Sequence, residues 1–150
     1  FGTVIAPLDY VLRADAFTMA ALDGALTDVA AGKRYVDIAA VEGLTEDAEG
    51  NVKIRAALTN IKAANLTRAF AAVSYVKVVD ATGNATYYYS EFDAVENVRA
   101  IRQVAEAALA DTKETQEGAY IYAILDEEGT VVAYSRYSES ERAVLKTFVA

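Results

Sequence analysis

Alternating apolar and polar positions predict that β-hairpins make up most of this chain. Residues 70–79 and 85–90 are rich in β-branched and aromatic side chains and flank a short loop that contains glycine. This pattern is the strongest hairpin signal in the sequence. Residues 119–125 and 130–134 lie on either side of a polar turn and predict another hairpin. The period of two therefore predicts antiparallel pairing in the middle and near the end of the chain.

The first third of the chain carries weaker strand signals. Residues 1–6 predict a short strand that Pro7 ends, because proline cannot donate to a strand ladder. Residues 34–41 and 51–58 predict a third hairpin, with the acidic loop 42–50 between its arms. In the second arm, apolar side chains alternate with polar ones, as expected for a strand with one face in water.

A helical period replaces the period of two in three other segments. Beyond Ala94, apolar residues recur every three or four positions and predict an amphipathic helix over about residues 95–110. Ser138 and Glu141 have the spacing of a capping box and predict a last helix over about 139–149. Residues 15–31 are rich in alanine and predict one short helix or an irregular segment.

Runs of strands with helices appended predict an α+β, β-dominated fold. We expect an antiparallel sheet or sandwich of hairpins with the two later helices against it. With one proline and no tract rich in glycine or serine, the sequence shows no linker, so we expect residues 1–150 to form a single domain. Because the chain begins at Phe1 without methionine, we expect it to be a processed product or, as we favour, a fragment of a longer protein, with any localisation signal upstream.

Composition excludes several common chemistries. The 150 residues include no cysteine, histidine or tryptophan. The chain therefore has no thiol nucleophile, no imidazole acid or base, no Ser-His-Asp triad and no ligands for a structural zinc site. We expect no cofactor and no enzymatic activity. Acidic residues outnumber basic ones by 22 to 14, which gives a net charge of −8 and disfavours nucleic acid as a partner. The apolar stretches are too short to span a bilayer, so no membrane insertion is expected.

Most of the chain resembles one class of bacterial module. The resemblance rests on residues 60–76, the turn with Asp80 and Gly83, the run 87–90 and residues 97–105, with 1–7 before them and 137–145 after them. These segments resemble uncharacterised small modules of large secreted or surface multidomain proteins of anaerobic, gut-type Gram-positive bacteria. The resemblance implies an extracellular or cell-surface location and no catalytic residues.

Acidic clusters are the candidates for catalysis or metal binding. A glycoside hydrolase needs two carboxylates that face each other across a cleft, and calcium binds carboxylate oxygens. The acids that cluster lie in two predicted hairpin loops: Glu46, Asp47 and Glu49 in one, and Asp126, Glu127 and Glu128 in the other. We regard Glu46, Asp47, Glu49, Asp126 and Glu128 as weak calcium candidates, because neither loop has EF-hand spacing. The favoured interpretation is a pair of charged, solvated turns.

Tyrosines are the candidates for recognition. Ten tyrosines outnumber five phenylalanines, and the period of two puts Tyr87 with Tyr89, and Tyr120 with Tyr122, on shared strand faces. A tyrosine ring can stack on a sugar while its hydroxyl makes hydrogen bonds. The competing interpretation, which we favour, is that these rings are half-buried cross-strand pairs beneath a helix. The exposure of the four rings decides between the two.

These observations favour a non-catalytic module of an extracellular bacterial multidomain protein, with a spacer, surface-display or adhesion role. Its expected partner is a polysaccharide or another domain of the same protein. The first alternative is a carbohydrate-binding module that uses a tyrosine face. The second is a fragment of a carboxylate-based glycoside hydrolase.

Overall fold

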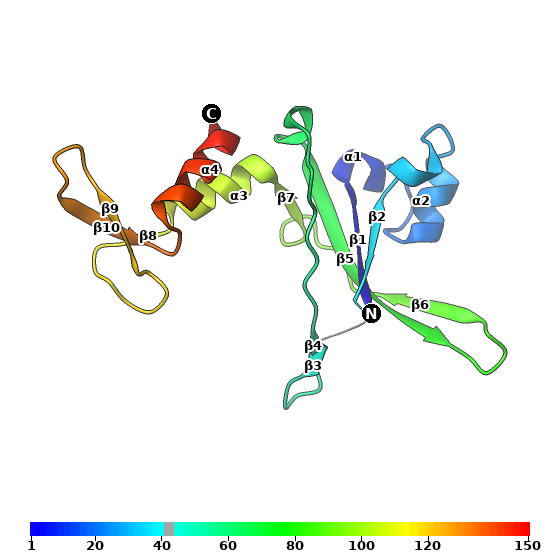
Figure 1. The fold of residues 1–150 in the computed structure, drawn as a ribbon. Helices are drawn as coiled ribbons and strands as arrows, with labels where there is room; N and C mark the ends of the chain where they lie inside the picture. Colours follow the sequence, from blue (N-terminus) through cyan, green and yellow to red (C-terminus); the bar gives the residue numbers. More distant parts are fainter. Residues whose placement is uncertain (41–43) are drawn as a thin grey trace. The chain divides into compact units, whose positions relative to one another are not determined.

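Antiparallel strands dominate the computed structural model, which describes residues 1–40 and 44–150 of the chain (Figure 1). The fold is α+β and β-dominated, as the sequence predicts. The chain packs into two compact units. The first contains residues 1–62 and 68–99, and the second contains residues 63–67 and 100–150.

The first unit is built on one sheet. The long strand β5 (Ala69–Val79) lies at its centre and pairs antiparallel with β1 (Gly2–Pro7) on one side and β6 (Ala85–Tyr89) on the other. Strand β2 (Val36–Ala39) adds to the outer edge of β1, and β7 (Val98–Ala100) pairs with β5. The predicted hairpin over residues 70–79 and 85–90 is confirmed as β5 and β6.

Two short helices cover one face of this sheet. Helix α1 (Leu8–Val11) follows Pro7 directly, and α2 (Met19–Ala25) begins after Thr18, whose hydroxyl accepts a hydrogen bond from the Ala21 amide. A 3-10 turn, η1, spans Ala31–Lys33. The buried core of the unit joins sheet and helices, with Val4, Ala6, Val11, Phe17, Leu22, Leu26, Ala71, Val73 and Tyr75 as its members. The unit is therefore a sheet covered by α1 and α2, whereas the two later helices, which the sequence predicts against the sheet, belong to the second unit.

The predicted hairpin between residues 34–41 and 51–58 is wrong. Strand β2 pairs with β1, far away in the sequence, while β4 (Val52–Lys53) pairs with β3 (Thr45–Glu46) in a small hairpin of its own. Residues 41–43, which belong to the predicted first arm and loop, lie outside the described residues. Strand β2 finds its hydrogen-bond partner in β1, and alternation alone does not reveal which distant strand will pair with it.

The second unit combines two helices and a three-stranded sheet. Helices α3 (Ile101–Ala110) and α4 (Glu139–Val149) contact each other, and a 3-10 turn, η2 (Ala63–Asn65), belongs to the same unit. The strand order is β8-β10-β9, with the elements β8 (Thr112–Lys113), β9 (Tyr122–Leu125) and β10 (Val131–Ser135). The predicted hairpin near the C-terminus is confirmed, with a register shift between Val131 and Ala133.

The predicted first long helix begins later than its periodicity suggests. Helix α3 starts at Ile101 rather than near Val95, because Asp93 closes a turn by accepting hydrogen bonds from the amides of Val95 and Glu96, and β7 follows that turn. The last helix matches its predicted bounds. None of the helices among the described residues is both long and apolar enough to cross a membrane.

The capping box of α4 gives a first testable prediction. The Glu141 amide donates to the Ser138 hydroxyl at 3.3 Å, and the Ser138 amide donates to the Glu141 carboxylate at 2.8 Å. Replacing Ser138→Ala removes one of these bonds, so the second unit should lose about 1 kcal/mol of unfolding free energy. Urea unfolding followed by far-ultraviolet circular dichroism measures this loss. Ser138→Asp, which keeps the capping acceptor, should restore most of it.

Candidate functional site

Three hairpin loops share one arrangement of an aspartate and a glycine. The loops begin at Asp47, Asp80 and Asp126, and in each the glycine three residues later has a φ angle between 82° and 88°. The aspartate Oδ1 accepts hydrogen bonds from the backbone amides two and four residues later, at 2.8–3.0 Å. The glycine amide donates to the carbonyl of the aspartate at 3.1 Å. In each loop, the Asp-x-x-Gly pattern therefore predicts a hydrogen-bonded turn, with the aspartate side chain as acceptor and the glycine at positive φ.

This arrangement gives the acidic clusters a structural role. Backbone amides bonded to the Asp47 carboxylate lower its pKa, with the largest effect from the Asn51 amide. The hydroxyl of Thr82 and the Asn84 amide lower the pKa of Asp80 in the same way. The neighbouring Glu46 and Glu49 are exposed, as are Glu127 and Glu128 in the third loop. Within residues 1–40 and 44–150, no three or more Asp or Glu side chains gather in a group that could hold a metal ion.

The loop at Asp80 gives a second testable prediction, in which two glycines serve as a matched pair. Gly83 has a φ of 88° and open space around its α-carbon, so Gly83→Ala adds backbone strain without a clash. We expect a loss of about 1–2 kcal/mol of unfolding free energy. Gly24 lies in α2 with equal space around it, and Gly24→Ala should instead add about 0.4–1 kcal/mol. Urea unfolding of both variants checks the opposite signs, and equal effects would contradict this explanation of the loop.

Tyr87 and Tyr89 lie on the face of the sheet that carries the core. Tyr89 stands opposite Tyr75 in the ladder, and Tyr87 stands opposite Lys77. The ring centroid of Tyr75 lies 5.4 Å from that of Tyr87 and 6.0 Å from that of Tyr89. The hydroxyl of Tyr89 accepts a hydrogen bond from the Met19 amide at the start of α2. The shared face predicted for Tyr87 and Tyr89 is confirmed, and it is a cluster built on the buried Tyr75.

Within the cluster, Tyr87 is the most exposed ring and Tyr89 is half-buried. Tyr87 is 38% exposed, at the outer end of the cluster, and the ammonium of Lys77 lies 5.8 Å from its ring centroid. Tyr75 is buried and donates a hydrogen bond of 2.7 Å to Asp37. Its ring lies so close to Gly2 that a Cβ atom there would collide with it. A glycine at the start of β1 therefore allows the cluster to form.

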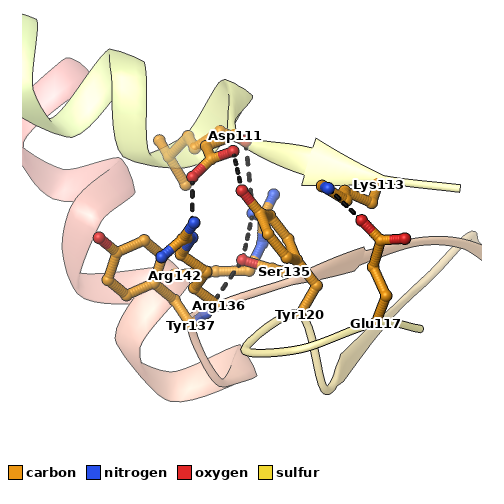
Figure 2. A network of polar contacts seen from close by, with 9 residues as sticks. Asp111, Lys113, Glu117, Tyr120, Ser135, Arg136, Tyr137 and Arg142 are labelled. Atoms are coloured by element: carbon orange, nitrogen blue, oxygen red, sulfur yellow. Dashed lines mark hydrogen bonds and ion pairs between the residues drawn. The ribbon is translucent and has the colours of Figure 1, made fainter. Parts of the chain in front are cut away.

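Tyr120 is held inside a polar network of the second unit (Figure 2). Only 8% of it is exposed, and its hydroxyl donates to Asp111 at 2.6 Å. The guanidinium of Arg136 lies 4.6 Å from the ring centroid and the ammonium of Lys113 lies 5.0 Å from it. Arg136 also forms an ion pair with Asp111 at 3.2 Å. The ring is covered on these sides and is not an accessible stacking surface.

Tyr122 differs from Tyr120 although both belong to the same predicted face. It stands in β9 opposite Ser135 and is 41% exposed. Tyr120 precedes β9 and takes part in an isolated bridge with Glu117. Of the four candidate tyrosines, Tyr87 and Tyr122 are therefore the ones with substantial exposure, and they lie in different units.

A groove in the first unit contains an exposed tyrosine that the sequence reasoning did not select. It has a volume of about 520 Å³, and its lining includes Phe1, Val52, Ile54, Val76 and Tyr88. Tyr88 is 62% exposed and lies opposite Val76 in the ladder, on the face away from α2. Strand alternation was the signal that could have found it, since Tyr88 must point opposite to Tyr87 and Tyr89.

Comparison with known proteins adds no relative. No protein-family model, no curated protein and no solved structure matches the chain.

Proposed function

We propose that this chain is a non-catalytic module of an extracellular bacterial multidomain protein, with a spacer, surface-display or adhesion role. The proposal rests on the hydrogen bonds that the aspartates of the acidic loops make within their own turns. The carboxylates of Asp47, Asp80 and Asp126 each accept hydrogen bonds from backbone amides of their own turn. The residues best suited to acid–base chemistry therefore stabilise the turns. The extracellular and bacterial parts of the proposal rest on the sequence resemblance.

A module that connects or displays other domains must resist tension. We therefore propose to place the chain between reference domains and stretch it from both ends by single-molecule force spectroscopy. Separate force peaks are expected as the two units unfold. The full extension of 150 residues corresponds to about 50 nm at roughly 3.3–3.6 Å per residue. Smooth lengthening without force peaks would overturn the mechanical role.

The catalytic alternative has a separate readout. The chain is incubated with a panel of plant and host polysaccharides, and the release of reducing ends is measured. We expect release at the level of the blank. Release above the blank that is lost in Glu46→Gln or Glu128→Gln would overturn the non-catalytic proposal, since it would assign these loops to hydrolysis.

A carbohydrate-binding role is the second candidate, favoured by the exposure of aromatic rings in the first unit. Tyr87 is partly exposed, and Tyr88 lines the groove described above. Aromatic rings beside polar groups suit a sugar, whose ring face is apolar and whose edge is polar. The groove also contains Ser74 and Ser90, which supply hydroxyl groups.

A glycan array tests this second candidate. Binding that is lost in Tyr87→Ala or Tyr88→Ala and retained in Tyr122→Ala would support it, because Tyr122 is a similarly exposed tyrosine in the other unit. Each variant must unfold cooperatively in urea with a midpoint close to that of the natural chain, which shows that it is folded. No binding across plant and host glycans, or equal loss in all three variants, would exclude a tyrosine site in the first unit.

A further inference from the structure

A small pocket of the second unit brings aliphatic side chains and charged side chains together. It lies between β9 and α4, which both belong to this unit, and has a volume of about 270 Å³. Its β9 side consists of Ala123, Ile124 and Leu125, and Ala143 adds a methyl group from α4. Pockets for drug-sized ligands have volumes of roughly 300–1,000 Å³, so a pocket of this size suits a smaller molecule.

The charged residues of the pocket follow one another along α4. Glu139, Arg142 and Lys146 are spaced by three and four residues, so they lie on one face of the helix. Glu139 stands in the first turn, and Lys146 lies about 10 Å further along the helix axis. Asp126, which follows Leu125, directs its carboxylate to the backbone amides of its own turn. The pocket is therefore positive at the Lys146 end, although the whole chain has a net charge of −8.

Arg142 is half-buried and makes its hydrogen bonds to uncharged groups. Its Nη1 atom donates to the carbonyl of Leu109 and to the hydroxyl of Ser135, both at 3.4 Å (Figure 2). Ser135 is fully buried, so these bonds hold the guanidinium in place. None of the ion pairs within residues 1–40 and 44–150 includes Arg142 or Lys146. A guanidinium carries several N–H donors, and those that Arg142 does not use in these bonds can donate to an anion in the pocket.

The lining selects among anions. A carboxylate can accept two parallel hydrogen bonds from a guanidinium and is attracted by the ammonium group of a neighbouring lysine. An aliphatic chain attached to it would lie against Ile124 and Leu125 and leave water. The pocket lining contains no aromatic ring on which a sugar could stack. A carboxylate with a short aliphatic chain therefore matches both parts of the lining.

We propose that the pocket between β9 and α4 binds an aliphatic carboxylate, with its charged end at Arg142 and Lys146 and its chain against β9. This site goes beyond the spacer role and does not depend on it. It also differs from the candidate sugar site, because Tyr87 and Tyr88 belong to the first unit.

Hexanoate and two related compounds test the inference. Each is titrated at constant ionic strength into the ¹⁵N-labelled chain, and the amide signals of Ile124 and Ala143 are followed. Hexanoate should shift both signals. Acetate has the same charge but almost no chain, so it should bind roughly tenfold more weakly. Hexylamine has the chain but carries an ammonium group in place of the carboxylate, and it should leave both signals in place.

Two lysines form a matched pair of variants. Lys146→Gln removes an exposed ammonium group from the pocket and should weaken hexanoate binding about two- to fivefold. Lys77→Gln makes the same change of net charge in β5 of the first unit and should leave the affinity unchanged. Lys146→Arg keeps the charge and should bind like the natural chain. Unchanged amide signals of β10 show that the second unit is folded in each variant.

Three outcomes would overturn the inference. The first is the absence of any hexanoate-induced shift at Ile124 and Ala143. The second is an equal shift by hexylamine, which would mean that the pocket recognises the aliphatic chain and not the carboxylate. The third is equal weakening by Lys146→Gln and Lys77→Gln, which would assign the binding to the net charge of the chain.

Discussion

Replacing Tyr120→Ala should lower the unfolding free energy of the second unit by roughly 3–5 kcal/mol, because it removes a buried aromatic side chain. The variant also loses the hydrogen bond to Asp111 and leaves the charges of Arg136 and Lys113 without the ring between them (Figure 2). Hydrogen exchange of the amides in β9 and β10 measures the loss within this unit.

The phenylalanine variant separates the ring from its hydroxyl. Tyr120→Phe keeps the packed ring and removes only the hydrogen bond, so it should cost about 1–2 kcal/mol. If Tyr120→Ala were as stable as the natural chain, the ring would not be part of the core. Tyr120 could then be reconsidered as a sugar-binding residue.

The unfolding free energy of the first unit should fall by up to about 2–3 kcal/mol as the pH rises through the range from 10 to 12. Burial, and then the hydrogen bond to Asp37, raise the pKa of Tyr75 from 10.0 to about 12. Below pH 10, Tyr75 is neutral in both states and the full stability is present. Above pH 10, the unfolded chain releases the phenolic proton while the folded chain retains it, so stability is lost until the folded pKa is reached.

Urea unfolding at several alkaline pH values, with tyrosine ionisation followed by ultraviolet absorbance, measures this loss. Tyr75→Phe should reduce the slope. The burial of Tyr35, which also raises its pKa, contributes in the same direction and leaves part of the slope in place. Tyr88→Phe is the matched control, because Tyr88 is exposed and lies on the opposite face of β6. A slope that Tyr75→Phe leaves unchanged would contradict the role given to this phenol.

The aromatic side chains of this protein serve two purposes that the sequence does not distinguish. Tyr75 and Tyr120 are buried, and each donates a hydrogen bond to an aspartate of another segment, Asp37 within β2 and Asp111 directly after α3. Tyr88 and Tyr122 are exposed, and the strand register places them opposite Val76 and Ser135. Experiments on recognition should therefore begin with the exposed pair and with Tyr87, and experiments on stability with the buried pair.

Local signals in the sequence predicted most of the regular structure. The sequence predicts the capping box at Ser138 and the hairpin turn at Asp80, because residues only a few positions apart make the hydrogen bonds of both. The partner of β2 was not readable, because β1 lies more than thirty residues earlier and alternation does not identify the strand that pairs with it. The start of α3 was also missed, since the turn at Asp93 interrupts a pattern that is helical in periodicity.

The sequence by itself determined the fold class, the hairpin at Asp80 and the last helix, and it excluded every chemistry that needs cysteine or histidine. Tertiary structure alone decided which tyrosines are buried and which strands pair with β1 and β5. The physical reason is that the hydrogen bonds of a turn or a helix cap join residues only two to four positions apart in the chain. The exposure of a ring and the pairing of an edge depend instead on residues that only the folded chain brings together.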